Sequence, residues 1–444
     1  MKNGLKVLAL FLVTTLLLTA CSALDGLFTD DKKPPLKGER ISVLQLQQAL
    51  VPNPELQKAP LTLPEPWLNK FWPQTGGYPN HAMGHLTLDS ALKRVWSASI
   101  GTGGDRRDPL IVEPVVADGM VFTLDTEAQV TAFDLANGKK KWRISSVPLG
   151  EEHKGYIGGG LAYSSGKLYV TNGYKQLICI NPASGGMVWR ASVPSPARSA
   201  PTAVGDKVYL ITLDNRLMVF SGSDGTPLWN YSGITETTNL LGSISPAVDA
   251  TLVVLPLSSG EIFGLRNENG QVVWQDNLSS VRRSGAFSSI ADIRGQPVID
   301  QGLIYAVSYS GRLVAIDEVS GQRVWQREIG SAEMPWAAGA TVFVLSADQQ
   351  VIALTRQGGE IRWITPLQRF EGDSKDKPVV WTGPVLAGGR LILASNRGQM
   401  VEINPQDGRI IKQTDLPGNV MIPPVVADST LLLLTEGGDL VAYR

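Results

Sequence analysis

His81 and His85 are the residues whose type and spacing come closest to a metal site. A separation of four residues would place both imidazoles on one face of a helix. Zinc needs at least three protein ligands, however, and the third histidine, His153, is far away in the sequence. Gly84, between the two histidines, weakens a helix. We therefore predict no metal site, and we interpret both histidines as hydrogen-bonded side chains of a docking segment.

Nucleophilic chemistry has few candidates in this chain. Of the 2 cysteines, Cys179 lies in the apolar stretch Leu177-Ile178-Cys179-Ile180, a strand pattern that favours a buried structural thiol. The glycine-rich stretch that begins at Gly101 lacks the Lys-Ser/Thr ending and the following helix of a phosphate loop. No Ser/His/Asp or Cys/His arrangement follows from spacing. The sequence predicts no catalytic residue.

The other cysteine, Cys21, has the context of a lipid-attachment site. Lys2 and Lys6 precede an apolar run over residues 7–18. This run is too short to span a membrane and is typical of a signal peptide. The run ends in Leu-Thr-Ala-Cys, which matches the bacterial lipobox. That resemblance implies removal of residues 1–20, acylation of Cys21 with palmitate or similar chains, and membrane attachment through lipid alone. Ser22, where Asp would retain a lipoprotein at the inner membrane, implies the outer membrane and a periplasmic orientation.

Composition narrows the function classes further. The chain has 444 residues, 43% of them hydrophobic, so it can bury a large core. Its 40 basic residues balance 41 acidic ones, which removes the main driving force for nucleic-acid binding, and we predict no nucleic-acid partner. The two cysteines exclude a disulfide-stapled scaffold.

Residues 21–91 are interpreted as a lipid-anchored, Pro-rich tether and docking extension. The polar stretch 30–35 suits a tether. Seven prolines then interrupt any regular element, at Pro52, Pro54, Pro60, Pro64, Pro66, Pro73 and Pro79. Trp67, Phe71 and Trp72 indicate that part of this segment docks on a surface.

From Trp96 onward the chain repeats one unit about every 45 residues, the period of a four-stranded propeller blade. In six units a Gly stands four residues before a Trp. The repeated tryptophans are Trp96, Trp142, Trp189, Trp229, Trp274, Trp325 and Trp363, and a further unit has Lys412 at this position. Pro114, Pro201, Pro246, Pro297, Pro384 and Pro424 head the other hairpin of their units.

The residue types explain the unit. Alternating apolar residues form half-buried strands, and a Gly at the turn accepts a positive φ. The Trp that follows has enough surface to fill the space between two twisted sheets, so we predict a structural role for all seven.

The two ends of the chain complement each other. Residues 438–444 match the third strand of a unit, and the missing fourth strand, which ends in Trp96, stands at residues 92–96. An N-terminal strand that completes the last blade would close the ring and remove exposed edges. The sequence predicts an all-β fold, an eight-bladed β-propeller of four-stranded antiparallel blades over residues 92–444.

The repeat resembles the pyrroloquinoline-quinone (PQQ) repeat. Together with the lipobox, eight repeats and little else resemble the BamB family, propeller lipoproteins of the outer-membrane β-barrel assembly (BAM) machinery. The resemblance implies a non-enzymatic periplasmic scaffold that needs no cofactor. It also implies binding to the POTRA domains of BamA and to other BAM components, in support of the insertion of outer-membrane proteins.

In that family two loops on one side of the ring bind BamA. The positions that match the first loop include Leu240 and Leu241, and those that match the second are Asp292 and Arg294. Leu241 replaces a family Arg and Arg294 replaces a family Asp, so the charge pattern of the expected partner-binding site is altered.

Two alternatives stay open. PQQ-dependent dehydrogenases share the repeat, although their vicinal cysteine pair near the quinone is missing from this sequence. Exposed blade edges could instead make the protein a general binder of unfolded periplasmic proteins, including unfolded outer-membrane proteins, through strand pairing.

Overall fold

The structure is a computed structural model that describes residues 50–151, 158–197, 199–234, 244–279, 292–372 and 375–444. By internal contacts the chain divides into Met1–Leu50 and Val51–Arg444. Cys21 and the predicted signal peptide lie outside the described residues.

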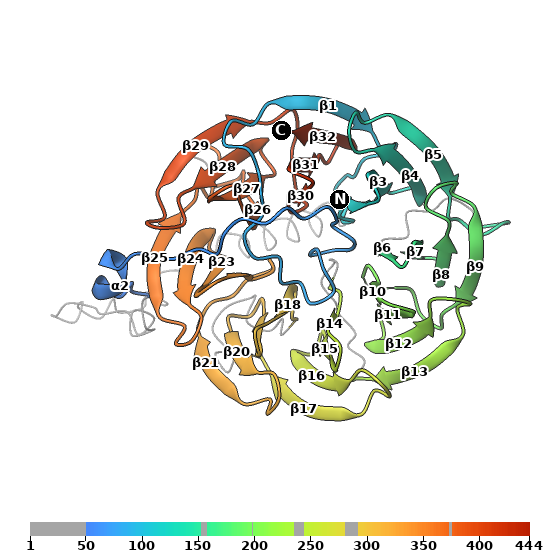
Figure 1. The fold of residues 1–444 in the computed structure, drawn as a ribbon, viewed down its shortest axis with the longest axis horizontal. Helices are drawn as coiled ribbons and strands as arrows, with labels where there is room; N and C mark the ends of the chain where they lie inside the picture. Colours follow the sequence, from blue (N-terminus) through green and yellow to red (C-terminus); the bar gives the residue numbers. More distant parts are fainter. Residues whose placement is uncertain (1–49, 152–157, 198, 235–243, 280–291, 373–374) are drawn as a thin grey trace, which may run out of the picture. The chain divides into compact units, whose positions relative to one another are not determined.

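Eight four-stranded antiparallel sheets are arranged in a ring (Figure 1). We number the sheets as blades 1 to 8 in the order in which the chain forms them. Blade 1 contains β2 (Val115–Ala117), β3 (Met120–Leu124), β4 (Gln129–Asp134) and β5 (Lys140–Ser145). Blade 2 contains β6 (Gly159–Ser164), β7 (Lys167–Asn172), β8 (Gln176–Ile180) and β9 (Met187–Ser192). Blade 3 contains β10 (Thr202–Val204), β11 (Lys207–Ile211), β12 (Arg216–Ser221) and β13 (Pro227–Ser232).

The next three blades continue the pattern. Blade 4 contains β14 (Ala247–Val248), β15 (Leu252–Pro256), β16 (Glu261–Arg266) and β17 (Val272–Asn277). Blade 5 contains β18 (Gly295–Asp300), β19 (Leu303–Val307), β20 (Leu313–Asp317) and β21 (Arg323–Arg327). Blade 6 contains β22 (Trp336–Ala338), β23 (Thr341–Leu345), β24 (Gln350–Thr355) and β25 (Ile361–Pro366).

The last two blades complete the ring, and blade 8 combines the last three strands of the chain with the first one. Blade 7 contains β26 (Trp381–Ala387), β27 (Arg390–Ser395), β28 (Gln399–Ile403) and β29 (Ile410–Asp415). Blade 8 contains β30 (Val425–Ala427), β31 (Thr430–Leu434), β32 (Asp439–Tyr443) and, as its outer strand, β1 (Arg94–Ser99). A single short helix, α2 (Pro54–Lys58), stands among the residues described.

The pairing of β1 with β32 closes the ring. Ser97 pairs with Val441, and Ala98 pairs with Leu440. At the end of the ladder, Lys93 and Arg444 exchange two backbone hydrogen bonds of 2.7 and 3.0 Å. The predicted eight-bladed propeller, completed by an N-terminal strand, is confirmed.

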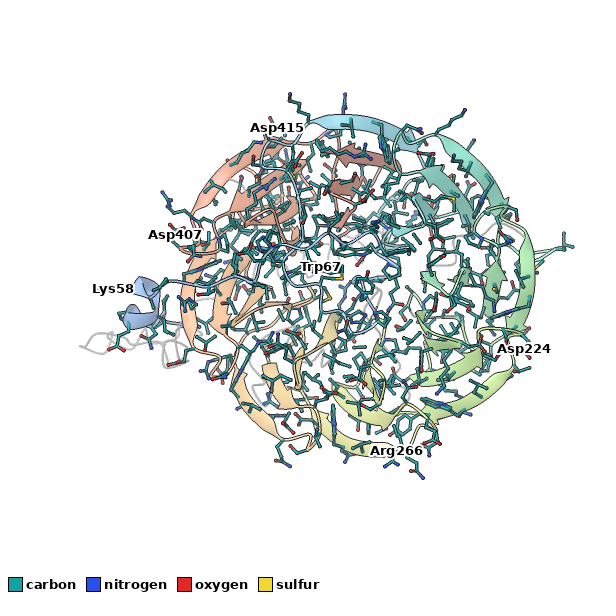
Figure 2. The ribbon with its side chains drawn as sticks, in the orientation of Figure 1. Lys58, Trp67, Asp224, Arg266, Asp407 and Asp415 are labelled. Carbon is teal, nitrogen blue, oxygen red and sulfur yellow. The ribbon has the colours of Figure 1, made fainter. Side chains whose placement is uncertain are left out.

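Burial follows the position of each strand in its blade. The inner strands are buried along most of their length, whereas outer strands such as β5 and β9 alternate between exposed and half-buried residues. Apolar clusters lie between neighbouring sheets, for example between blades 1 and 2 and between blades 4 and 5. Figure 2 shows charged residues such as Asp224, Arg266 and Asp407 at the outer rim.

The repeated Trp and Gly form one contact between neighbouring blades. Gly138 of blade 1 has a φ of +71°, and a Cβ on it would lie 2.5 Å from the ring of Trp96 in blade 8. The same contact joins Gly359 to Trp325, and it recurs at each of the seven tryptophans. Only a residue without a side chain allows the indole of one blade to lie against the turn of the next.

Blade 7 shows why one unit has no Trp. In blade 8 the outer strand β1 and its neighbour β32 are far apart in the sequence and are not joined by a turn, so no glycine turn is present to receive an indole. Lys412 stands at the Trp position and lies 3.5 Å from Glu402 instead. Within the described residues, no helix is long and apolar enough to cross a membrane.

Candidate functional site in the central channel

The N-terminal extension makes a full circuit inside the ring. Between residues 69 and 86 it forms a hydrogen bond to the inner strand of every blade, in blade order from blade 8 through blades 1 to 7. The bonds join Asn69 Nδ2 to Val426 O (2.6 Å), Trp72 N to Val116 O (2.9 Å), Tyr163 N to Pro73 O (2.6 Å), Ala203 N to Gln74 Oε1 (3.0 Å), Val248 N to Pro79 O (2.8 Å), Ile299 N to Asn80 O (2.9 Å), Trp336 Nε1 to Gly84 O (2.7 Å) and Leu86 N to Leu386 O (3.0 Å). Figure 1 shows this segment in blue across the centre of the ring. We call residues 69–86 the plug.

The plug closes on itself and stabilises the inner edges. Trp67 N donates to His85 O, and Thr87 N donates back to Trp67 O, both at 3.0 Å. Trp72, Met83 and Leu86 are buried in the core shared by blades 6, 7, 8 and 1. Inner strands of a propeller have one unpaired edge, so the plug supplies partners for amides and carbonyls that would otherwise face the channel.

Residues before the plug lie against the outside of blades 6 and 7. Asn53 N donates to Ile361 O at 2.8 Å, on the outer strand β25. The guanidinium of Arg362 donates to Ala59 O at 2.6 Å. Leu61 exchanges two hydrogen bonds with the side chain of Gln406. The extension therefore crosses from the outer edge of one blade to the centre of the ring.

His81 and His85 are both structural parts of this segment. His81 Nδ1 lies 2.7 Å from Pro297 O, and burial lowers the pKa of His81 to about 4, so the ring is neutral. His85 Nδ1 lies 2.7 Å from Pro64 O, while its Nε2 accepts from Gly389 N at 2.9 Å. His153 lies outside the described residues. In the part of the chain that the structure describes, no three His, Cys, Asp or Glu side chains are placed to hold a metal ion.

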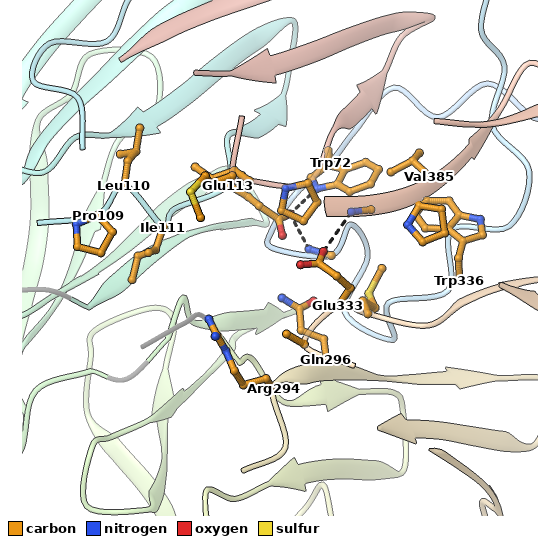
Figure 3. Close-up of a pocket in the computed structure, with 18 of the residues that line it drawn as sticks. Trp72, Pro109, Leu110, Ile111, Glu113, Arg294, Gln296, Glu333, Trp336 and Val385 are labelled. Atoms are coloured by element: carbon orange, nitrogen blue, oxygen red, sulfur yellow. Dashed lines mark hydrogen bonds between the residues drawn. The ribbon is translucent and has the colours of Figure 1, made fainter. Parts of the chain in front are cut away.

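The plug is one wall of a cavity in the channel, with a volume of about 330 Å³ (Figure 3). Trp72 and Gly76 contribute from the plug. The other walls come from segments that lead into inner strands, among them residues 109–113, 332–336 and 421–423. Met421 is 47% exposed, so the cavity reaches solvent on the side where the chain enters the inner strands.

Glu113 is the first of two buried carboxyl groups in this cavity. Its side chain is 6% exposed and accepts hydrogen bonds from Gly76 N (2.9 Å) and Trp72 Nε1 (3.3 Å). Burial raises the pKa of Glu113 to about 7, although both hydrogen bonds oppose the shift, and the nearby charge of Glu333 adds to it. Glu113 thus links the first blade to the plug and titrates near neutral pH.

Glu333 is the second carboxylate of the cavity. It accepts from Thr382 Oγ1 (2.8 Å) and from Gly383 N (3.1 Å), which belong to β26. Burial raises the pKa of Glu333, while these hydrogen bonds and the charge of Arg294 act in the opposite direction. Figure 3 shows Glu333 and Arg294 on the walls of the same cavity.

Sequence reasoning did not single out Glu113 or Glu333. A signal was present, because each precedes an inner strand by a few residues: Glu113 stands directly before the Pro114 that heads blade 1, and Glu333 stands three residues before Trp336. Segments in that position converge on the axis of a propeller. Without the ring, however, two acids 220 residues apart in the chain (333 minus 113) show no relation.

The structure describes two of the four predicted partner-binding residues, Asp292 and Arg294. Leu240 and Leu241 lie outside the described residues. Asp292 is 2% exposed, and its carbonyl accepts from Tyr309 N at 3.0 Å. Arg294, two residues further on, is half-buried and lines the central cavity. The structure therefore places Arg294 nearer to the channel than to the rim of the ring.

The repeated tryptophans and Cys179 lie in the body of the propeller. Six of the seven indoles donate to a backbone carbonyl of the next blade, for example Trp325 Nε1 to Arg356 O at 2.7 Å. Cys179 is a free, buried thiol in β8, and burial raises its pKa to about 11. A thiol with so high a pKa is a poor nucleophile at neutral pH.

Ring, repeat and closing strand define the class of protein: an eight-bladed propeller built from PQQ-type repeats. The profile of one family in this class, described as outer membrane protein assembly factor BamB, matches residues 127–365 and 371–444. The chain belongs to the BamB family, as the sequence resemblance predicted.

Individual proteins agree with this assignment. The outer membrane protein assembly factor BamB of Yersinia pestis is 28% identical over 356 residues, which cover 79% of this chain and 88% of the relative. The crystal structure of BamB from Moraxella catarrhalis superposes with a TM-score of 0.68 at 21% identity, over 80% of this chain and all of that one. A europium-containing methanol dehydrogenase reaches a TM-score of 0.65 at 13% identity, over 88% of this chain and 99% of the enzyme, a likeness of fold alone.

Proposed function

We propose that this protein is a non-enzymatic scaffold of the BAM machinery that assists the assembly of outer-membrane proteins. It would be held at the outer membrane by lipid on Cys21 and would face the periplasm. The observation that carries the proposal is the extent of the family match, which covers residues 127–365 and 371–444. The match therefore lies in the propeller itself and not in an added domain.

The POTRA domains of BamA are the proposed partner. In the sequence, Leu240 and Leu241 precede the inner strand β14, and Asp292 and Arg294 precede β18, the inner strand of the neighbouring blade. A few residues near the centre of an interface contribute most of its binding energy, and we assign that place to Leu240 and Leu241, the apolar residues of the first matched loop. Asp292, at 2% exposure, would hold the second loop in place, and Arg294 would border the contact from the channel side.

Co-purification of BamA from detergent-solubilised outer membranes tests this proposal. The Leu240→Asp variant is expected to recover at least about tenfold less BamA, because it places a charge in an apolar contact. Leu228→Asp is the matched control, since Leu228 is 48% exposed on the outer strand β13 and should leave recovery unchanged.

Three results would contradict different parts of the proposal. If the wild-type protein recovers no BamA, the proposed function is wrong. If Leu240→Asp recovers as much as wild type, the complex stands and the contact site is wrong. Recovery of many unfolded outer-membrane proteins without BamA would favour the strand-pairing function instead. One contact supports that alternative, because Asn53 pairs with the outer edge of β25 within this same chain.

The likeness to quinoprotein dehydrogenases raises the question of whether PQQ fits the channel. PQQ carries three carboxylates, whereas the central cavity is lined by Glu113, Glu333 and Glu436 against one arginine, Arg294. Like charges in a cavity of low polarity repel strongly. Cys179, the one cysteine that the structure describes, is buried within blade 2 and offers no cysteine pair beside a quinone. The residues of the channel do not fit this cofactor.

A further inference from the structure

The central cavity holds two buried acids, and Arg294 is the one basic side chain among the described residues that lines it. Glu113 and Glu333 both line it, and among the described residues neither forms an ion pair with a Lys or Arg side chain. Their hydrogen-bond donors are neutral: two backbone amides, one indole and one hydroxyl. A buried carboxylate without a counter-charge is costly, so it takes up either a proton or a cation from outside.

The remaining walls favour an organic cation over a metal ion. Leu110, Ile111, Val385 and Ile422 present hydrocarbon, which cannot replace the water shell of a metal. Trp72 and Trp336 line the same space, with their rings stacked at a centroid distance of 6.4 Å and an angle of 21°. Aromatic rings beside carboxylates are the groups that recognise ammonium ions, and aliphatic walls suit a hydrocarbon stem.

The size and placement of the cavity also suit a small ligand. Its volume of about 330 Å³ lies at the lower end of the range for small-molecule sites. Trp72 and Gly76 of the plug form one wall, and the half-exposed Met421 marks contact with solvent. The charged side chains that face the cavity are Glu113, Glu333 and Glu436 on the acidic side and Arg294 on the basic side.

We propose that this cavity is a binding site for a small aliphatic amine in its ammonium form, with the nitrogen between Glu113 and Glu333 and the carbon chain along the apolar walls. Three acids (Glu113, Glu333 and Glu436) and one base (Arg294) give the cavity a formal charge of −2, so the site can accept a second ammonium group at the other end of the carbon chain. Burial raises the pKa of both acids, because the charged form of a carboxyl group loses its hydration inside the protein. The inference is independent of BamA binding.

Calorimetric titration with 1,4-diaminobutane tests the proposal on the soluble protein without its signal peptide. A pH of about 8 is suitable, because a carboxyl with a pKa near 7 is then mostly ionised, and low ionic strength limits screening. Saturable binding with one ligand per chain is expected. Butane-1,4-diol has the same carbon chain without charge, and butanedioate has the opposite charge, so neither should bind.

Variants locate the site. Glu333→Gln and Glu113→Gln should each weaken binding about tenfold or more, the change expected from loss of one charge-assisted contact. Ala332→Phe should abolish binding by filling the cavity without altering its charge. Glu268→Gln, on an exposed outer turn, should bind like wild type. Circular dichroism confirms that each variant is folded.

The proposal is overturned by any of three results: no saturation with the diamine in the millimolar range, equal binding of the uncharged diol, or wild-type affinity in both glutamine variants. Glu113 also contacts the plug, so the Glu333→Gln and Ala332→Phe variants decide the matter if Glu113→Gln proves unstable. A loss of diamine binding in these two variants with unchanged circular dichroism supports the site.

Discussion

At the scale of single residues, Glu113 combines structural and electrostatic roles. Its carboxylate accepts from Trp72 and Gly76 and so joins blade 1 to the plug, yet it is buried without a basic partner among the described residues. Burial raises its pKa from 4.5 to about 7. The folded protein therefore binds the proton of Glu113 more tightly than the unfolded chain does.

This difference predicts a pH-dependent stability. The stabilising contribution of Glu113 is fully present below pH 4.5, where both states are protonated, and it is lost as the pH rises through about 7. Between these limits the shift corresponds to about 3 kcal/mol of unfolding free energy. Glu113→Gln should lack this term, so its stability relative to wild type should increase with pH. Urea unfolding in amine-free buffers measures the effect; parallel pH profiles of the two proteins would contradict it, and Glu268→Gln serves as the control.

At the scale of elements, each blade is joined to the next by an indole against a glycine turn. The contact explains two sequence positions at once, because the Gly must be small and the Trp must be large. In the pair Trp325 and Gly359, the indole also donates to Arg356 O. A Cβ on Gly359 would lie 2.5 Å from the indole, at a φ of +62°.

A double-mutant cycle tests this contact. Trp325→Ala should lower the unfolding free energy by about 3–5 kcal/mol, the usual cost of removing a buried Trp. Gly359→Ala should cost more than Gly302→Ala, since Gly302 has a φ of +80° but open space around its Cβ position. In the Trp325→Ala background the cost of Gly359→Ala should fall to the backbone cost of about 1 kcal/mol. If the losses of unfolding free energy measured by chemical denaturation are strictly additive, Trp325 and Gly359 do not interact as described.

Sequence periodicity could predict these elements because the residues that form the strands, the turn and the Trp contact of a blade all lie within one repeat of about 45 residues. Lys412 illustrates the limit of that reasoning. The sequence shows that the Trp is missing there, but the reason is apparent only once β1 and β32 are seen to replace the outer turn of blade 8.

At the scale of the whole molecule, closure depends on a short non-covalent ladder between the two ends of the propeller. Lys93 and Arg444 exchange two backbone hydrogen bonds at its end, and the Arg444 guanidinium also donates to Leu135 O and Ala136 O of blade 1. Opening this ladder would expose the edge of β32 and break the hydrogen bonds between blades 8 and 1.

A disulfide across the ladder between β1 and β32 should stabilise the ring. Facing residues of a hydrogen-bonded antiparallel pair have Cα atoms about 5.5 Å apart, within the range that a disulfide spans. The oxidised Lys93→Cys/Arg444→Cys protein should exceed its reduced form by about 3–5 kcal/mol of unfolding free energy. Denaturant unfolding with and without reductant gives the comparison, and Lys93→Cys alone is the control. Equal stability of the two forms would contradict this prediction.

The sequence alone determined the repeat, the number of blades, the strand order and the closing strand. These features depend on residues that are close together in the chain and that recur with a fixed period. The sequence also contained the family resemblance. The tertiary structure decided what lies at the centre: the circuit of residues 69–86 past eight inner strands, the burial of Asp292, and the meeting of Glu113, Glu333 and Arg294 around one cavity. These contacts join segments from different blades, and only the closed ring brings such distant positions to a common axis.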